Sequence, residues 1–257
     1  MNQIDQTRWS LEGKVVLLTG ASKGIGEAMA REMGRAGAHV IVSSRKQEAV
    51  EEVAQQLTKE GIKASAFACN TGSTTEMEQL IATISKEFGR LDVLVNNAAT
   101  NPVFGNITEA EVRAFDKIMD VNLKGPWYLS SLASRLMKVQ NSGSIINISS
   151  IEGISPSENL GIYSISKAAL IMLTKVLANE LGRYGIRVNA ICPGYIKTKL
   201  SEMVWNDEKL LEEVMQQQAI NYKAVPDDIA GIAWLLASDA GRFFTGSVIT
   251  VDGGFTI

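Results

Sequence analysis

The sequence is poor in the residues that bind metals or form disulfides. Among its 257 residues there are two cysteines, Cys69 and Cys192, and one histidine, His39. Two cysteines so far apart favour a reducing compartment, and we expect both to be buried free thiols. A single histidine leaves too little for a Ser-His-Asp triad or a His/Cys metal site, so we expect no metal.

The chain also lacks a strong excess of one charge. Lysine and arginine number 25 against 28 acidic residues, and the net charge is −3. This balance provides no electrostatic footprint for nucleic acid or an anionic membrane surface. The longest apolar stretches, such as "AALIMLTKVLA", are interrupted by Lys175, so we expect no membrane-spanning segment.

Targeting signals are missing at both ends of the sequence. The first ten residues, "MNQIDQTRWS", lack the apolar core of a signal peptide, and the closing "GGFTI" is not a peroxisomal or retention tripeptide. We therefore expect a cytoplasmic protein.

Short apolar, β-branched runs alternate along the chain with helical patterns. Because the runs are nearly continuous rather than alternating, they predict strands covered on both faces of a sheet. The predicted strands are 14–19, 39–43, 63–68, 91–95, 143–149, 186–192 and 247–251. Intervening segments such as 24–37 and 75–89 have apolar residues three and four apart. The pattern predicts an α/β fold: a single doubly wound Rossmann-type domain over 1–257, with a seven-stranded parallel sheet and helices on both faces.

Two segments depart from this alternation. Residues 155–182 predict a long helix that is apolar around much of its circumference, which calls for burial by the sheet and by another subunit. Residues 196–222 form an insertion that combines methionine, tryptophan and charge. This composition favours a small helical lid over a pocket.

A glycine-rich turn follows the first predicted strand. In "TGASKGIG", Gly20, Gly24 and Gly26 permit a tight turn and close approach of a pyrophosphate to the N-terminus of the next helix. Such a turn can also be purely structural. Its position between the first strand and the first helix favours dinucleotide binding.

The end of the second strand indicates which dinucleotide is bound. An NAD site usually places a carboxylate there, whereas "VSSRK" has Ser43 and Ser44 followed by Arg45, and Lys23 lies in the glycine-rich turn. Hydroxyls and two cations suit a 2′-phosphate. We therefore predict NADP(H) rather than NAD(H).

A tyrosine precedes a lysine by four residues at two places in the chain. The pairs are Tyr163 with Lys167, in "YSISK", and Tyr195 with Lys199. A pair one helical turn apart is common on ordinary helix surfaces, so the spacing does not select either pair as catalytic.

The order of several motifs distinguishes between the two tyrosine–lysine pairs. "TGASKGIG", "NNAA" (96–99), "SS" (149–150), "YSISK" and "PG" (193–194) occur in the order typical of the short-chain dehydrogenase/reductase family, which the chain resembles from about residue 11 to 254. Within the family, "AATNPVFG" (98–105) and "VSSRKQ" (42–47) look most like the tetrameric NADP-dependent carbonyl reductases of the dehydrogenase/reductase group.

The resemblance implies a catalytic set of Asn122, Ser150, Tyr163 and Lys167. The family pattern has a serine thirteen residues before the tyrosine, which is Ser150 for Tyr163 but Gly182 for Tyr195. Tyr163 is then the general acid, with its pKa lowered by Lys167, and Ser150 donates to the substrate oxygen. Asn122 holds a water linked to Lys167. Ser149 remains a competitor of Ser150, since adjacent strand residues face opposite sides.

The resemblance also assigns cofactor and pocket residues. The implied cofactor contacts are Gly20, Ser22, Lys23, Gly24, Ile25, Gly26, Ser44, Arg45, Asn70, Thr71, Asn97, Ala98, Tyr163, Lys167, Pro193, Gly194, Ile196 and Thr198. Tyr195, Met203 and Trp205 are the predicted substrate pocket, and packing within the lid is the alternative role for the last two.

The leading functional hypothesis is an NADPH-dependent reductase of ketones, aldehydes or dicarbonyls. A 3-oxoacyl-carrier-protein reductase is an alternative, with Arg135, Lys138 and Lys197 as candidate contacts for an acidic carrier. An alcohol, polyol or steroid dehydrogenase and a non-catalytic dinucleotide sensor on the same fold are further alternatives. We expect a small-molecule carbonyl substrate and a homotetramer.

Overall fold

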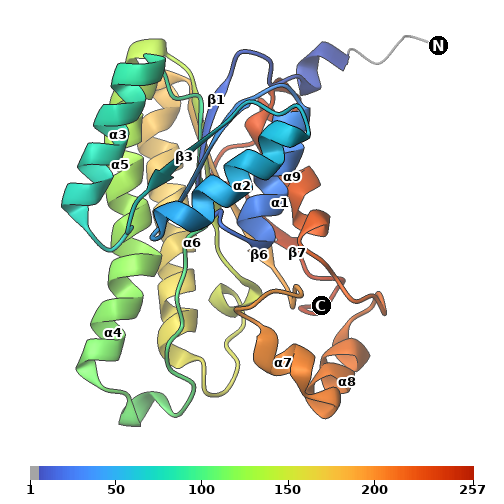
Figure 1. Cartoon of the computed structure of the whole chain (residues 1–257). Coiled ribbons are helices and arrows are strands. Elements are labelled where there is room, and N and C mark those ends of the chain that lie inside the picture. Colours follow the sequence, from blue (N-terminus) through green and yellow to red (C-terminus); the bar gives the residue numbers. More distant parts are fainter. Residues whose placement is uncertain (1–5) are drawn as a thin grey trace.

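Seven strands form a parallel sheet in the order β3-β2-β1-β4-β5-β6-β7 (Figure 1). The structure is a computed structural model that describes residues 6–257, apart from the side chains of Gln6 and Met203. The strands are β1 Val15–Thr19, β2 His39–Ser44, β3 Ala64–Ala68, β4 Val93–Asn96, β5 Gly143–Ile148, β6 Ile186–Pro193 and β7 Val248–Val251. The predicted seven-stranded parallel sheet is confirmed.

Helices cover both faces of the sheet (Figure 1). On one face lie α1 Gly24–Arg35, α2 Gln47–Lys59 and α9 Asp227–Ala237; on the other lie α3 Thr74–Phe88, α5 Gly125–Gln140 and α6 Gly161–Leu181. Successive side chains of a strand point to opposite faces. Val16 and Leu18 of β1 therefore pack in the first core, and Val15 and Leu17 in the second.

The remaining elements lie mainly around the carboxyl ends of the strands. Helix α4, Val112–Met119, continues through a π-helical turn, Asp120–Lys124, into α5. The insertion predicted at 196–222 contains two helices, α7 Glu202–Asn206 and α8 Glu208–Gln217. Short 3₁₀ turns occupy Gln6–Trp9, Ile107–Glu109, Ile151–Gly153, Gly182–Tyr184 and Asp239–Gly241.

The winding direction of the sheet reverses between β1 and β4. The chain builds outward from β1 to β3, then crosses back and builds outward on the other side from β4 to β7. In doubly wound folds the crevice at such a reversal, outside the carboxyl ends of the strands, binds the ligand. Gly20 follows β1 and Asn97 follows β4, so the motifs predicted to bind a dinucleotide lie beside this crevice.

The long helix predicted over 155–182 is wrong at its start, because α6 begins at Gly161. Ser155 precedes a proline, which disfavours helical backbone at Ser155. Asn159 has a left-handed φ of 66°, and the Ser157 amide donates to the carboxylate of Glu152 at 2.9 Å. These features hold the segment before α6 as a loop.

Helix α6 is long and apolar. The stretch Gly161–Tyr184 is long and apolar enough to cross a membrane by length and composition, which the interruption at Lys175 did not lead us to expect. The test does not distinguish a core helix, and Leu170, Leu177 and Leu181 of α6 are buried. Met172, on its outer side, is 58% exposed.

Candidate active site

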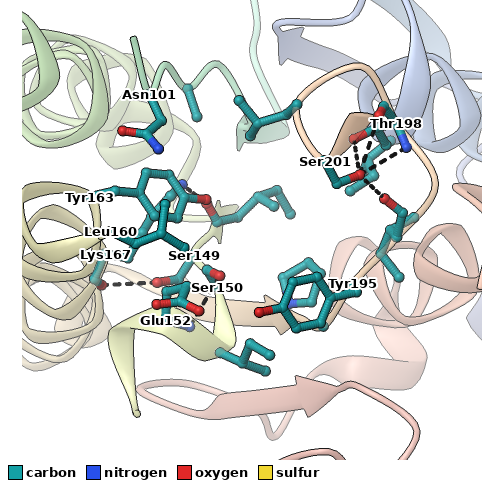
Figure 2. A pocket seen from close by; sticks show the side chains of 18 of the residues that line it. Asn101, Ser149, Ser150, Glu152, Leu160, Tyr163, Lys167, Tyr195, Thr198 and Ser201 are labelled. Atoms are coloured by element: carbon teal, nitrogen blue, oxygen red, sulfur yellow. Dashed lines mark hydrogen bonds between the residues drawn. The ribbon is translucent and has the colours of Figure 1, made fainter. Parts of the chain in front are cut away.

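A cavity of about 360 Å³ opens at the carboxyl ends of β4, β5 and β6 (Figure 2). Its apolar wall comes from the loop after β4, from the start of α6 and from the insertion. The described residues that line it include Ile25, Asn97, Ala99, Asn101, Pro102, Val103, Phe104, Ile148, Ser149, Ser150, Ile151, Glu152, Leu160, Tyr163, Lys167, Pro193, Gly194, Tyr195, Ile196, Thr198, Leu200, Ser201 and Val204.

Tyr163 and Lys167 lie one turn apart on the same face of α6 and both line the cavity. The Lys167 ammonium lies 5.5 Å from the centroid of the Tyr163 ring. It is fully inside the protein, where it donates to the carbonyl oxygen of Ile148, the last residue of β5, at 2.8 Å. Lysine side chains are rarely buried without a partner, and here the backbone carbonyl supplies it.

Ser149 and Ser150 both reach the cavity wall, contrary to the expectation that only one of them faces it. Strict alternation fails because β5 ends at Ile148, before either serine. Their hydroxyls differ in their partners. Ser149 donates to the backbone carbonyl of Lys167 at 2.9 Å, whereas Ser150 accepts from the amide of Glu152 at 3.1 Å and lowers the pKa of Tyr163.

The partners of the two serines indicate different roles. The Ser149 proton is used in holding α6 against the end of β5. Ser150 is placed beside the tyrosine hydroxyl, and with a backbone amide as its donor it retains its own proton for donation. The arrangement favours Ser150 over Ser149 as the hydroxyl that contacts a substrate oxygen.

Asn122 lies below the cavity, in the π-helical turn between α4 and α5. Its amide nitrogen donates to the carbonyl of Thr100 at 3.0 Å and to the hydroxyl of Ser166 at 3.1 Å, while its oxygen accepts from the Thr100 amide at 2.8 Å. Single π-turns occur often at functional sites. Here the turn lets Asn122 connect the loop after β4 with α6, beside the Tyr163–Lys167 pair.

Burial dominates the electrostatics of the pair. It raises the pKa of Tyr163 above its usual range, a hydrogen bond from Ser150 lowers this pKa, and the negative charge of Glu152 raises it further. Burial also lowers the pKa of Lys167 to about 8. The pKa of Tyr163 is therefore raised rather than lowered as expected, because burial outweighs the influence of the Lys167 ammonium, which is bound to a carbonyl and is itself desolvated.

The glycine-rich turn has the form expected for a pyrophosphate site. No side chain of the described residues caps the N-terminus of α1, so its first amides are not occupied by a side chain. Uncapped helical amides favour an anion. A Cβ at Gly26 would lie 2.6 Å from the side-chain nitrogen of Asn97 and from the Gly20 carbonyl, so only glycine fits there.

Asn97 and Thr19 fix the turn after β1 against the loop after β4. The Asn97 side chain donates to the carbonyls of Thr19 and Gly20 at 2.9 and 3.0 Å. The Thr19 hydroxyl accepts from the amides of Asn97 and Ala98 at 3.0 and 3.1 Å. Asn97 therefore has a structural role in shaping the turn in addition to its place in the cavity wall.

The residues predicted to hold a 2′-phosphate lie at the ends of two adjacent strands. Thr19 pairs with Ser43, and the Ala21 amide donates to the Ser43 carbonyl at 3.0 Å, so the turn containing Lys23 lies beside the end of β2. Lys23 and Arg45 are exposed and, among the described residues, form no ion pair. Ser43 is buried at 1% exposure and cannot reach a phosphate, which corrects its place in the sequence argument.

The predicted cofactor residues fall into two groups. Ile25, Asn97, Tyr163, Lys167, Pro193, Gly194, Ile196 and Thr198 line the cavity, whereas Gly20, Ser22, Lys23, Gly24, Gly26, Ser44, Arg45, Asn70, Thr71 and Ala98 lie outside its wall. An extended ligand that starts at the glycine-rich turn and ends in the cavity would contact both groups. The residues present therefore fit a dinucleotide with its nicotinamide end in the cavity.

One of the three residues predicted for the substrate pocket lines the cavity. Tyr195 lines the cavity, with its ring 5.2 Å from that of Phe255. Trp205 is not among the residues that line it, and its indole N–H is buried without a hydrogen-bond partner in the described part of the structure. The Met203 side chain lies outside the described part of the structure. Val204 and Leu200 supply the apolar lid contacts instead.

Sequence reasoning missed the wall formed after β4 and the acid after β5. Asn101, Val103 and Phe104 belong to a segment without helix or strand, and its only signal was the resemblance of "AATNPVFG" to one group of relatives. Glu152 follows Ser150 by two residues and had no signal, because one glutamate in a turn looks like surface charge.

Comparison with known proteins agrees with this geometry. The model of a family described as Enoyl-(Acyl carrier protein) reductase matches residues 20–256. The human protein named Dehydrogenase/reductase SDR family member 4 is 40% identical over 244 residues, which cover 95% of this chain and 88% of that protein. This chain is a short-chain dehydrogenase/reductase. The resemblance seen in the sequence is confirmed.

Solved structures of other short-chain dehydrogenases/reductases superpose closely on this one. A gluconate 5-dehydrogenase from Burkholderia cenocepacia in complex with NADP and tartrate has a TM-score of 0.95 at 29% identity, over 98% of this chain and 99% of that chain. A 7α-hydroxysteroid dehydrogenase complexed with NADH and 7-oxo glycochenodeoxycholic acid has a TM-score of 0.94 at 30% identity, with 98% of each chain covered. The protein is an NAD(P)-dependent oxidoreductase that interconverts carbonyl and alcohol groups.

The buried lysine predicts a pH dependence of stability. Its folded pKa of about 8 lies below the usual 10.5, so between these values the unfolded chain binds more protons than the folded one. The contribution of Lys167 to the free energy of unfolding therefore rises with pH, by about 2–3 kcal/mol from pH 8 to 10. Urea unfolding of the wild type and of Lys167→Met across this range should show the wild type gaining stability relative to the variant. A difference independent of pH contradicts the assignment.

Proposed function

We propose that this short-chain dehydrogenase/reductase uses NADPH to reduce a ketone, aldehyde or dicarbonyl to an alcohol, with Tyr163 as the general acid. One observation carries the proposal: Tyr163 and Ser150 line the same mainly apolar cavity, Ser150 acts on the phenol so as to lower its pKa, and the Lys167 ammonium lies 5.5 Å from the centroid of the tyrosine ring. A carbonyl oxygen placed at these two hydroxyls meets both a proton source and a second donor.

The chemistry follows from the state of these groups. A bound nicotinamide would supply the hydride. The raised pKa keeps Tyr163 protonated at neutral pH, and the alkoxide formed from a carbonyl is far more basic than a phenolate, so proton transfer from Tyr163 is favourable. Ser150, which accepts from the Glu152 amide, directs its proton toward the developing oxyanion.

Lys167 and Asn122 would support the proton donor. The Lys167 ammonium would hold the nicotinamide ribose and, once a phenolate forms, would stabilise its charge. Asn122 bridges the Thr100 backbone and Ser166 and would place a water that returns a proton to Lys167. Together they allow Tyr163 to be reprotonated without exposing the cavity to bulk solvent.

The cavity wall supports an apolar substrate. Val103, Phe104, Leu160, Leu200 and Val204 surround the polar hydroxyls. Pockets of this kind bind through apolar contact and use a few polar groups for orientation. Ketones, aldehydes and vicinal dicarbonyls, including quinones, meet this description better than a charged sugar does.

The alternatives have weaker support. A 3-oxoacyl-carrier-protein reductase needs cations at the cavity mouth, but Arg135 and Lys138 lie near the end of α5, on the amino side of β5 and away from the cavity. Lys197 alone is close to it. Arg45 stands where an NAD site usually has an acid, which disfavours an NAD-dependent polyol or steroid dehydrogenase. The Ser150 and Tyr163 hydroxyls, both present in the cavity wall, disfavour a non-catalytic dinucleotide sensor.

We further propose a homotetramer, on the basis of exposed apolar surface. Val112 of α4, Trp127 of α5, and Ile165 and Met172 of α6 are between 46% and 75% exposed, and Phe243, before β7, is fully exposed. One apolar surface lies on α4, α5 and α6, and the other lies beside β7, so two different twofold contacts can form. A homotetramer with perpendicular twofold axes needs two such contacts.

Light scattering tests the assembly. We expect a mass four times that of the 27.8 kDa chain. Met172→Glu, which places a charge on the apolar outer face of α6, should shift the protein toward dimers or monomers. A wild-type protein that is monomeric at micromolar concentration contradicts the proposal.

Removal of the proposed acid tests the mechanism. Tyr163→Phe should lower kcat for a dicarbonyl by about 10²–10⁴-fold, because the proton donor is lost. NADPH binding, followed by fluorescence, should change by less than about threefold, since the ring and Lys167 remain. Tyr184→Phe, outside the cavity wall, is the matched control. Retained turnover in Tyr163→Phe refutes the assignment.

Charge reversal at the end of β2 tests the choice of coenzyme. The wild type should bind NADPH at least about tenfold more tightly than NADH, as one charge-assisted phosphate contact predicts. Arg45→Asp should reverse this preference, whereas Lys59→Ala, at the other end of α2, should leave it unchanged. Comparable wild-type affinities for the two coenzymes, measured by fluorescence titration, contradict an NADP site.

A further inference from the structure

A buried carboxylate stands in the cavity wall, and the proposed mechanism does not use it. Glu152 lies in the 3₁₀ turn after β5, two residues beyond Ser150, and is only 6% exposed. Its side chain lines the same cavity as Tyr163 and Ser150, and Tyr195 faces it from the other side (Figure 2). Glutamates are rarely buried, so this one needs a reason.

Three donors fix the position of the Glu152 carboxylate. One oxygen accepts from the Ser157 hydroxyl at 2.6 Å; the other accepts from the Ser157 amide and from the Ser164 hydroxyl, both at 2.9 Å. The negative charge is therefore held in one place, between the turn after β5 and the first turn of α6.

The charge acts on both walls of the cavity. Burial is the main cause of the raised pKa of Tyr163 and of Tyr195, and the negative charge of Glu152 raises both further. Ser157, in turn, lowers the pKa of Tyr195. A group that destabilises a phenolate on either wall also destabilises any other anion placed between them.

In the described part of the cavity wall, no cation faces the substrate space to offset this charge. Among the described residues that line the cavity, Glu152 is the one acid and Lys167 the one base. The Lys167 ammonium lies under the Tyr163 ring and donates to the Ile148 carbonyl. It is separated from the space where the substrate's own substituents would lie.

We propose that Glu152 is a specificity-determining residue, which excludes substrates that carry an anionic group next to the carbonyl and restricts this enzyme to neutral carbonyl compounds. The inference rests on the proposed function and narrows its substrate class. A carboxylate about 7 Å from Glu152, at an effective dielectric constant near 20, would be disfavoured about 50-fold. A 2-oxo acid would also lose its hydration on entry without finding a positive partner.

A matched pair of substrates tests the inference. Phenylglyoxylate and its methyl ester differ mainly in the charge beside the ketone. With NADPH, the wild-type kcat/KM should favour the ester by about 50-fold or more, and Glu152→Gln should reduce this ratio at least tenfold. The ratio cancels any loss that affects both substrates equally, such as a general change in the position of Ser150.

A nearby carboxylate supplies the control. Glu158 lies in the same loop, is exposed and does not line the cavity, so Glu158→Gln should leave the ester-to-acid ratio at its wild-type value. A ratio that is the same in wild type and Glu152→Gln overturns the role of Glu152. An equal fall in Glu158→Gln would show a general surface-charge effect and would also overturn it.

A binding measurement separates this inference from the proposed function. Phenylacetamide and phenylacetate carry no reducible ketone, and calorimetric titration of the NADPH-loaded protein reports their affinities without turnover. Wild type should favour the amide, and Glu152→Gln should remove most of that preference. If the ester is not reduced but this binding preference holds, the proposed reaction fails while the exclusion of anions stands. Equal wild-type affinities overturn the exclusion itself.

Discussion

A reciprocal pair of hydrogen bonds between the end of β5 and the middle of α6 holds the rest of the site in place. The Lys167 ammonium donates to the Ile148 carbonyl, and the Ser149 hydroxyl donates to the Lys167 carbonyl. Gly153 completes the contact, since a Cβ there would lie 2.7 Å from the Lys167 backbone. This close approach sets Tyr163 beside Ser150. A hydroxyl-to-hydroxyl contact between different elements needs such rigid support, because small displacements of reacting groups cost large factors in rate.

The same contact buries polar and ionisable groups, which costs folding free energy. A lysine, a tyrosine and a glutamate enter the interior together, and burial disfavours the ammonium of Lys167 and a phenolate at Tyr163. The sheet offsets this cost: apolar residues of β1, β2, β4, β5 and β6 pack on both faces against six helices. Buried amides add specificity, since Asn96 donates to Ser130 and Asn147, and Asn147 donates to Thr174. A well-packed core thus supports a polar site at its edge.

Charge is distributed differently at the two ends of the crevice. At the end of β2, Lys23 and Arg45 are exposed, and the N-terminus of α1 has no side-chain cap, so this end suits phosphate groups. In the cavity, the ammonium is covered and the carboxylate of Glu152 lies in the wall. An anionic coenzyme and a neutral substrate can therefore share one crevice, because each end stabilises a different charge.

The sequence by itself determined the elements and their order, because apolar periodicity and glycine placement are local properties of the chain. Ordered motifs likewise identified Tyr163, Lys167 and the turn at Gly20. Tertiary structure decided what depends on contacts between distant segments. It distinguished Ser150 from Ser149 by their partners, placed Trp205 outside the cavity, began α6 only at Gly161 and raised the pKa of Tyr163. The role of Glu152 was also decided by tertiary structure. Its burial and its hydrogen bonds with Ser157 and Ser164 place it in the cavity wall, and no local sequence pattern encodes these contacts.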